Sequence, residues 1–267
     1  LKATSTGADN TAVGKGALSA NTTGANNTAL GIKALETTTT VSGLTAVGHD
    51  ALTANTSGTF GTAVGFNALS ANTTGIRNTA LGSGALDVNT TGERNVGLGQ
   101  DALGACTTGS RNVAVGQAAL DAVTTQANNT AIGYASLSAA EASDNTAVGY
   151  FALLNNTTGT NNLGVGKDAG KAITTGDQNT IIGSLCHDNL TTGDLHTAIG
   201  YNLAPSAVDV DGEVVIGSNI SGGGANTVRI GVTAGNATLS LDGSDTSWAA
   251  SSDERLKENI VDSTAGL

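Results

Sequence analysis

The sequence predicts an all-β protein built as a parallel β-solenoid, and three observations predict this fold. A glycine returns every 17 residues along most of the chain, a short β-branched stretch precedes it, and turn-type residues follow it. This unit is too short for a helical-hairpin repeat, which needs roughly 33 residues or more. The repeat glycines are Gly14, Gly31, Gly48, Gly65, Gly82, Gly99, Gly116, Gly133, Gly149, Gly166, Gly183, Gly200, Gly217 and Gly231. They predict about fourteen stacked coils.

The composition fits a thin repeat structure better than a thick globular core. The chain has 267 residues with 38 glycines, no methionine and 3% aromatic residues, yet 39% of it is hydrophobic, which argues against disorder. Its net charge of -11 makes nucleic acid an unfavourable partner. No apolar run reaches the roughly 18 residues of a transmembrane helix, so we expect no membrane span.

Each coil is expected to begin with a short strand before the repeat glycine, as at residues 62–64. This segment reads Thr-Ala-Val in many coils, and the variants at 96–98 and 163–165 keep a small middle residue between two apolar ones. Alternation with a period of two indicates a strand. We expect the outer two residues to face the core and the small middle residue to face a close neighbour.

An Ala-Leu pair follows the glycine and predicts a second short strand, and an Asn-Thr-Thr-Gly segment then predicts a turn. The turn glycines are expected at positive φ, where glycine is least strained; they are Gly24, Gly58, Gly75, Gly92, Gly109, Gly159, Gly176 and Gly193. Stacked hydrogen bonds are expected along the turn asparagines, which are Asn21, Asn55, Asn72, Asn89 and Asn156.

A roll of this kind buries few apolar atoms per coil, so one chain alone is expected to be marginally stable. The row of alanine and glycine in the middle strand position would let a neighbouring chain approach closely. Both features favour a homo-oligomer. The alternative is that these small residues fit a narrow interior within a single chain.

The repeat Asn-Thr-Ala-Val-Gly-x-x-Ala-Leu, seen at residues 10–18, resembles the repeats in the head of trimeric autotransporter adhesins. The same long repeats occur in phage tail fibres and tail spikes. The resemblance implies a left-handed parallel β-roll assembled as a homotrimer. The usual unit of that family has 14 residues, so the longer unit here is expected to enlarge the Asn-Thr-Thr-Gly loop.

The segment Ser-Asp-Glu-Arg-Leu-Lys at residues 252–257 resembles the opening of the peptidase S74 domain, the intramolecular chaperone of phage tail fibres and endosialidases. This resemblance implies self-cleavage between Ser252 and Asp253, with Ser252 and Lys257 as a catalytic dyad. The residues alone also fit a helix start, with Ser252 as the N-cap and Glu254 in the first turn. Attack of Ser252 on its own carbonyl would need a four-membered ring, so the target and chain of origin of the nucleophile stay open.

The resulting domain prediction is a repeat array at 1–231, an intertwining connector at 232–251 and the truncated start of the chaperone at 252–267. The first residue is Leu1, so we expect a piece of a longer product. The leading functional prediction is the structural and adhesive shaft of a bacteriophage tail fibre, extracellular in the virion, bound to other tail proteins and to a host glycan or protein receptor. The alternatives are the shaft of a polysaccharide-depolymerising tail spike with its catalytic domain upstream, and a bacterial trimeric surface adhesin. We expect no enzyme activity in the mature chain, and no cofactor.

Candidate ligand-binding residues are Tyr134 and Tyr150, which directly follow repeat glycines and should sit one strand apart. Stacked tyrosines on a rod can serve as a platform for sugars, although a packing ladder is the simpler interpretation.

Metal-ligand spacing is absent from the sequence. His49, His187 and His196 fall at unrelated repeat positions, so no metal site is predicted from them. Asp209, Asp211 and Glu213 surround Gly212 and could hold a cation, but a plain acidic turn is the favoured interpretation. Cys106 and Cys186 lie about five coils apart, too far for an intrachain disulfide.

Overall fold

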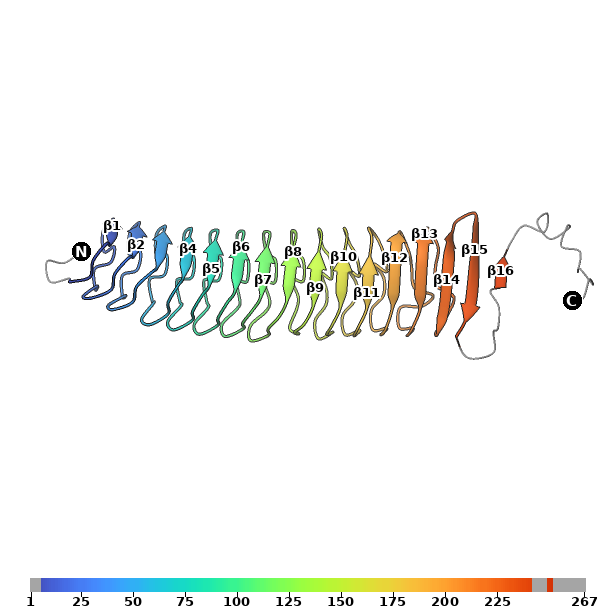
Figure 1. Ribbon diagram of the computed structural model, residues 1–267. Coiled ribbons are helices and arrows are strands. Elements are labelled where there is room, and N and C mark those ends of the chain that lie inside the picture. The colour runs from blue at the N-terminus through green and yellow to red at the C-terminus, as the bar shows by residue number, and fades with distance from the viewer. Residues whose placement is uncertain (1–5, 242–248, 252–267) are drawn as a thin grey trace, which may run out of the picture.

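The computed structural model describes residues 6–241 and 249–251, and these form a long rod (Figure 1). Their strands make one 16-stranded sheet in which neighbours in space follow the order of the chain. Among the described residues, no helix is long and apolar enough to cross a lipid bilayer. The strands are β1 (Thr11–Val13), β2 (Thr28–Leu30), β3 (Thr45–Val47), β4 (Thr62–Val64), β5 (Thr79–Leu81), β6 (Val96–Leu98), β7 (Val113–Val115), β8 (Thr130–Ile132), β9 (Thr146–Val148), β10 (Leu163–Val165), β11 (Thr180–Ile182), β12 (Thr197–Tyr201), β13 (Val214–Ser218), β14 (Thr227–Val232), β15 (Gly235–Ser240) and β16 (Ala249–Ser251).

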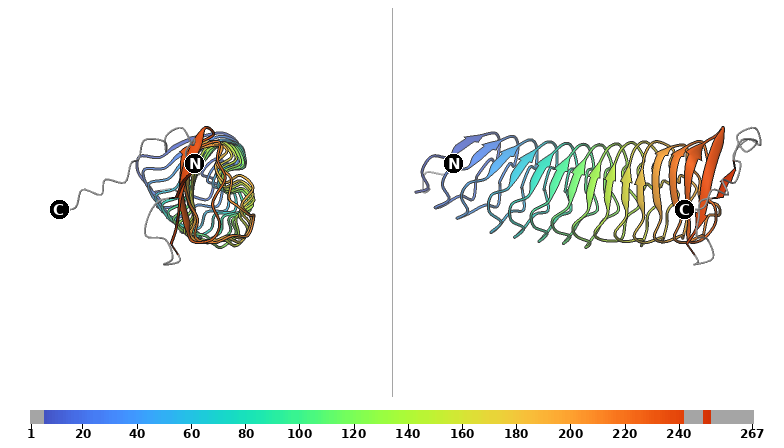
Figure 2. Two further views of the ribbon diagram at one scale, coloured as in Figure 1. Left: turned by 90° about the vertical axis from the view of Figure 1, so that its right-hand side faces the viewer. Right: turned by 45° about the vertical axis from the view of Figure 1, so that its right-hand side comes forward.

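The strands β1 to β14 pair in parallel, each with the strand of the next coil, and equivalent residues are in register, as in Ala46 opposite Ala63. This confirms the predicted parallel β-solenoid with 17 residues per turn, and it has about 13 turns rather than fourteen. The count differs because fourteen successive parallel strands, β1 to β14, are joined by thirteen turns. After β14 the chain reverses: β15 pairs antiparallel with β14, and β16 antiparallel with β15. Viewed along the rod, the coils lie over one another (Figure 2, left).

The interior of each coil is filled by the middle residue of the strand and by the leucine of the Ala-Leu pair. In β4 the side chain of Ala63 is fully buried, whereas Thr62 and Val64 are partly exposed. The prediction that the outer strand residues face the core is therefore wrong. A Cβ at Gly97 would lie 3.4 Å from Leu86 Cγ, so the leucine leaves room for little more than alanine in the strand opposite. The alternative interpretation, a narrow interior within one chain, matches the structure.

The Ala-Leu pair lies in a turn, so the second predicted strand is absent from the described coils. Leu69, for example, has a φ of 51°, in the left-handed region that strands do not use. Its N–H still donates to the carbonyl of Ala85 in the next coil, at 3.0 Å. Each coil therefore has one strand, and its remaining residues form turns that stack through single hydrogen bonds.

Two columns of glycine exist because the coils lie close together. Gly65 has a φ of 142°, and a Cβ on it would overlap the carbonyl of Gly82 in the next coil. The turn glycine Gly75 is not at positive φ, so that prediction is wrong, but its Cβ would overlap the carbonyl of Gly92. Close approach between backbones, more than turn geometry, selects glycine at the turn positions.

Candidate functional site

An aromatic cluster lies on the surface where the coils of β8 and β9 meet. The rings of Tyr134 and Tyr150 stack with centroids 5.4 Å apart and planes 15° apart, which confirms that they sit on adjacent coils. Phe151 joins them, with its centroid 4.0 Å from that of Tyr150. Both tyrosines are 45% exposed, so much of each ring remains accessible to solvent.

Charged side chains of the next coil border the aromatic cluster. The Lys171 ammonium lies 5.1 Å from the Phe151 ring centroid, within cation–π range. The carboxylate of Asp168 contacts Lys167 Nζ at 2.6 Å and Lys171 Nζ at 3.3 Å. Burial acts to raise the pKa of Asp168, but the hydrogen bonds from the two lysines outweigh it and lower that pKa. Exposed rings beside hydrogen-bonding charges are a suitable surface for a sugar or another flat polar ligand.

A second surface feature is the outer sheet face, which we define as the first and third residues of strands β1 to β13. One column is mostly threonine, with Val96, Val113, Leu163 and Val214 as exceptions, and the other is valine, leucine or isoleucine. The third-position side chains that are most exposed are Val13, Leu30, Leu81, Ile132, Ile182 and Ile199. An apolar column along so much of a rod is typical of a surface that another macromolecule covers.

Inside the rod, the residue before each strand forms a column of buried asparagines that the sequence analysis missed. We call it the pre-strand column; between β5 and β11 it consists of Asn78, Asn95, Asn112, Asn129, Asn145, Asn162 and Asn179. Asn129 shows the pattern: its Oδ1 accepts from Asn145 N at 3.0 Å, and its Nδ2 donates to Ala142 O at 2.8 Å. Each amide thereby joins its own coil to the next one.

The predicted ladder of turn asparagines is present in part. Asn72 Nδ2 donates to Asn55 Oδ1 at 2.9 Å, and Asn89 Nδ2 donates to Asn72 Oδ1 at 2.8 Å. In later coils, buried Cys106 and Val123 occupy equivalent positions, so the ladder ends there. Cys106 and Cys186 are both buried, and neither forms a disulfide within the described residues.

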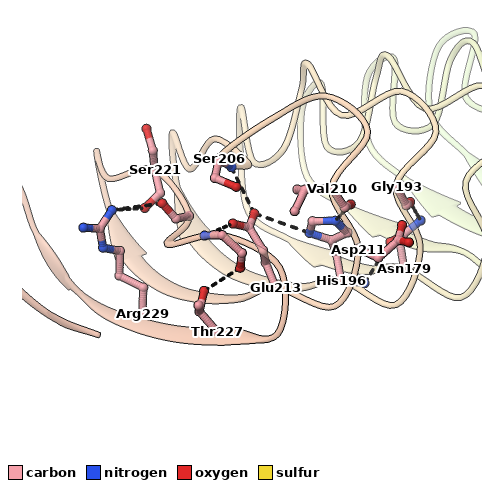
Figure 3. Close-up of polar contacts among 12 residues, drawn as sticks. Asn179, Gly193, His196, Ser206, Val210, Asp211, Glu213, Ser221, Thr227 and Arg229 are labelled. Carbon is pink, nitrogen blue, oxygen red and sulfur yellow. Dashed lines mark hydrogen bonds and ion pairs between the residues drawn. The ribbon is translucent and has the colours of Figure 1, made fainter. Parts of the chain in front are cut away.

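The pre-strand column changes its chemistry at its C-terminal end, where His196 precedes β12 and Glu213 precedes β13 (Figure 3). His187 packs against His196 with ring centroids 5.1 Å apart. All three side chains are buried. Each offers one potential metal-ligand atom, and these atoms all lie within 4.8 Å of one another. Burial, and then the neighbouring His196, lower the pKa of His187 to about 3, so this imidazole is neutral at pH 7.

The histidines occupy different positions in the repeat, so the sequence did not indicate that they meet. A repeat position does not show which side chains come together in the interior. The signal that could have found the cluster is that His196 and Glu213 each lie four residues before a repeat glycine, in the register of the asparagines. His187 likewise lies four residues after a repeat glycine, in the register of the buried leucines.

The acidic residues Asp209, Asp211 and Glu213, for which a plain acidic turn is the favoured interpretation, do not come together as a cation site. Glu213 is fully buried inside the rod, whereas Asp209 is exposed. Asp211 Oδ1 instead accepts from Asp194 N at 2.9 Å, a contact between successive coils. The three carboxylates are separated because Glu213 lies in the interior of the rod, whereas Asp209 and Asp211 are exposed.

The predicted dyad Ser252 and Lys257 lies outside the described residues, as does the bond between Ser252 and Asp253. The chain matches no protein-family model, and the comparisons with curated proteins and with solved structures gave no match. The resemblance to phage tail fibres therefore stays a prediction from the sequence.

Proposed function

We propose that this chain is the structural and adhesive shaft of a bacteriophage tail fibre, a homotrimer of left-handed β-rolls. The observation that carries the proposal is the outer sheet face, which exposes apolar side chains from Val13 in β1 to Ile199 in β12. In a single solenoid an apolar surface of this length stays exposed to water, which is unfavourable. Copies arranged around a common axis bury the same column from every chain.

The interior explains why association is favourable. A typical coil fills its interior with two alanines and one leucine, such as Ala63, Ala68 and Leu69, so a lone rod gains little from burial. Covering Val64 and its equivalents adds one larger apolar residue per coil. The self-contact assigned here lies on the outer residues of the strand and not on the small middle ones, which the chain buries itself.

The phage assignment is supported by the resemblance of residues 252–257 to the chaperone that matures tail fibres. In this proposal the chaperone aligns three chains and is released by cleavage between Ser252 and Asp253, with Ser252 and Lys257 as the dyad. The mature shaft is extracellular, joins other tail proteins and acts without catalysis. The aromatic cluster of Tyr134, Tyr150 and Phe151 supplies a surface for a host glycan.

The test is native mass spectrometry of the chain expressed with its natural C-terminal extension. We expect an assembly of three subunits, each ending at Ser252. An uncut monomer would contradict both trimer formation and self-release. A Ser252→Ala variant should keep the extension attached, and its trimer should still form.

The self-contact itself is tested by charge on the outer sheet face. The double variant Val64→Lys and Leu98→Lys should dissociate the trimer into folded monomers, because both side chains lie on the strand face that points away from the interior. Thr74→Lys, on an exposed turn, is the matched control and should remain trimeric. A trimer that tolerates both lysines would exclude this face as the contact.

A further inference from the structure

We propose that His187, His196 and Glu213 bind one divalent transition-metal ion, Zn²⁺ being the best match, inside the last coils of the solenoid. The three side chains come from neighbouring coils: His187 follows β11, His196 precedes β12 and Glu213 precedes β13. Their ligand atoms all lie within 4.8 Å of one another. The set of two imidazoles and one carboxylate is a donor set that zinc uses in proteins.

The chain departs from its own repeat at all three ligands. In nine earlier coils the position of His187 holds a buried leucine: Leu18, Leu35, Leu52, Leu69, Leu86, Leu103, Leu120, Leu137 and Leu153. His196 and Glu213 replace the asparagine of the pre-strand column. Each replacement puts a less suitable group into a buried place that the repeat already fills well. Three such departures that meet at one point indicate a common ligand.

His196 has the hydrogen bonding of a metal-bound imidazole. Its Nε2 lies 2.6 Å from Val210 O, which can only accept, so Nε2 donates this bond, and in the neutral ring the lone pair is on Nδ1 (Figure 3). A backbone carbonyl on the second ring nitrogen is the usual outer partner of a metal-bound histidine. Nδ1 lies 3.9 Å from Glu213 Oε2, and it has no hydrogen-bond partner among the described residues.

His187 is the second observation that points to a ligand. The side chain is fully buried, and within the described part of the chain neither ring nitrogen has a hydrogen-bond partner. Leaving a buried polar group without a partner is unfavourable. An ion bound to one of these nitrogens would give that nitrogen a partner.

Glu213 is held in place for the same task. Its Oε1 accepts from Gly224 N at 2.7 Å and its Oε2 from Ser206 N at 3.0 Å. Gly222 has no side chain, and a Cβ there would overlap the carboxylate. The carboxylate is thus oriented toward His196 by backbone groups, as ligating carboxylates commonly are. Its buried negative charge would be compensated by a divalent cation.

The expected geometry needs only a small adjustment. Ligand atoms at about 2.0 to 2.1 Å from a tetrahedral zinc ion are about 3.4 Å apart, so the present spread must close by roughly 1 to 1.5 Å. Rotation of the rings and of the carboxylate can supply it. Three protein ligands leave the fourth position for water. Mg²⁺ and Ca²⁺ prefer oxygen ligands, so they are poorer candidates.

The experiment measures bound metal in the full chain. Protein stripped with EDTA is incubated with Zn²⁺ and passed through gel filtration, and its zinc is determined by mass spectrometry. We expect about one zinc per chain and a higher melting temperature than in the stripped protein. With Co²⁺ we expect the visible absorption of a four- or five-coordinate site. Zinc below one tenth of an equivalent, with an unchanged melting temperature, would overturn the proposal.

Matched variants separate this site from unspecific binding. His187→Leu and His196→Asn each restore the residue of the regular repeat, so both should fold, and both should lose at least nine tenths of the bound zinc. His49→Gln removes a surface histidine, whose side chain is 45% exposed, and should keep the zinc. Retention of zinc by His187→Leu, or its loss in His49→Gln, would contradict the assignment.

Discussion

The pre-strand column differs sharply between its middle and its C-terminal end. From Asn78 to Asn179 every member is an asparagine, and each amide is used within its own coil and toward the next. At the end, the equivalent position four residues before the repeat glycine is occupied by His196, by Glu213 and by Thr227, the first residue of β14. Asn179 Oδ1 still accepts from His196 N at 2.9 Å, but His196 Nδ1 has no partner among the described residues.

The difference follows from the hydrogen-bonding capacity of the side chains. An amide can donate and accept at once, so a column of amides satisfies itself. A neutral imidazole has one donor and one acceptor in fixed directions, and a carboxylate only accepts. His196 reproduces the asparagine donor, because its Nε2 bonds to Val210 O just as Asn179 Nδ2 bonds to Gly193 O. In the neutral ring, Nδ1 of His196 has a lone pair and no hydrogen-bond partner among the described residues, so this atom is available to bind a ligand.

The largest expected effect comes from breaking the middle of the column with Asn129→Asp. The carboxylate loses the donor to Ala142 O and brings an unpaired charge into a fully buried place. We expect the free energy of unfolding to fall by about 3 to 5 kcal/mol, measured by urea denaturation. Asn26→Asp is the control, since Asn26 is exposed and Asp9 occupies the equivalent position, and it should change the stability by less than about 0.5 kcal/mol.

Alkylation of the two cysteines measures how easily the coils open in the middle of the array and near its C-terminal end. Burial raises the pKa of Cys106 to about 11 and that of Cys186 to about 12, so both thiols should react only when the coils open. Cys106 lies in the middle of the array, whereas Cys186 is next to His187. In metal-free protein we expect alkylation of Cys186 to be about tenfold faster, followed by peptide mass spectrometry, because terminal coils open more easily. Equal rates, or a faster Cys106, would show that the end is as stable as the middle.

Restoring the column at its end should have a smaller effect of opposite sign. In EDTA, His196→Asn supplies an amide that can accept from the next coil as well as donate, and it should raise the free energy of unfolding by about 1 kcal/mol. Thermal denaturation of both proteins with and without Zn²⁺ is the measurement. With Zn²⁺ the order should reverse, so a variant that is less stable in both conditions would argue against the comparison.

The smallest effect is expected at Asp168, whose side chain is largely buried but whose two lysine partners are exposed. Its lowered folded pKa means that its contribution to stability is present above about pH 4 and is lost as the pH falls through that folded pKa. Lys167 and Lys171 are 59% and 39% exposed, so solvent screens the pair. Asp168→Asn should cost less than about 1 kcal/mol at pH 7, and less at pH 2 than at pH 7, by urea denaturation at both pH values.

The repeat made the architecture predictable from the sequence. The spacing of the glycines identified the coil, and the alternation in Thr-Ala-Val identified the strand. Alternation could not show which side of the strand faces inward, because threonine and valine suit either side. The answer depends on the leucine opposite, such as Leu86 against Gly97, and therefore on packing across the coil. The prediction of a second strand was wrong for a related reason. The sequence around Leu69 gives no local sign that its φ is 51°, in the left-handed region.

The candidate sites were predictable to different degrees. Tyr134 and Tyr150 share one repeat position, so the period alone places them side by side. His187 and His196 hold different repeat positions, and they meet only because the coil folds one over the other. The connection becomes visible when each residue is compared with the asparagine or leucine that it replaces.

The register of the parallel strands has a consequence for length. Each strand contacts only the strands before and after it, and equivalent residues lie opposite one another. Removing or inserting one 17-residue unit in the middle would leave every other coil with the neighbours it needs, and would shorten or extend the rod by about 4.8 Å. The number of repeats thus sets the length of the rod. Gain or loss of repeats by recombination would change that length without altering either end.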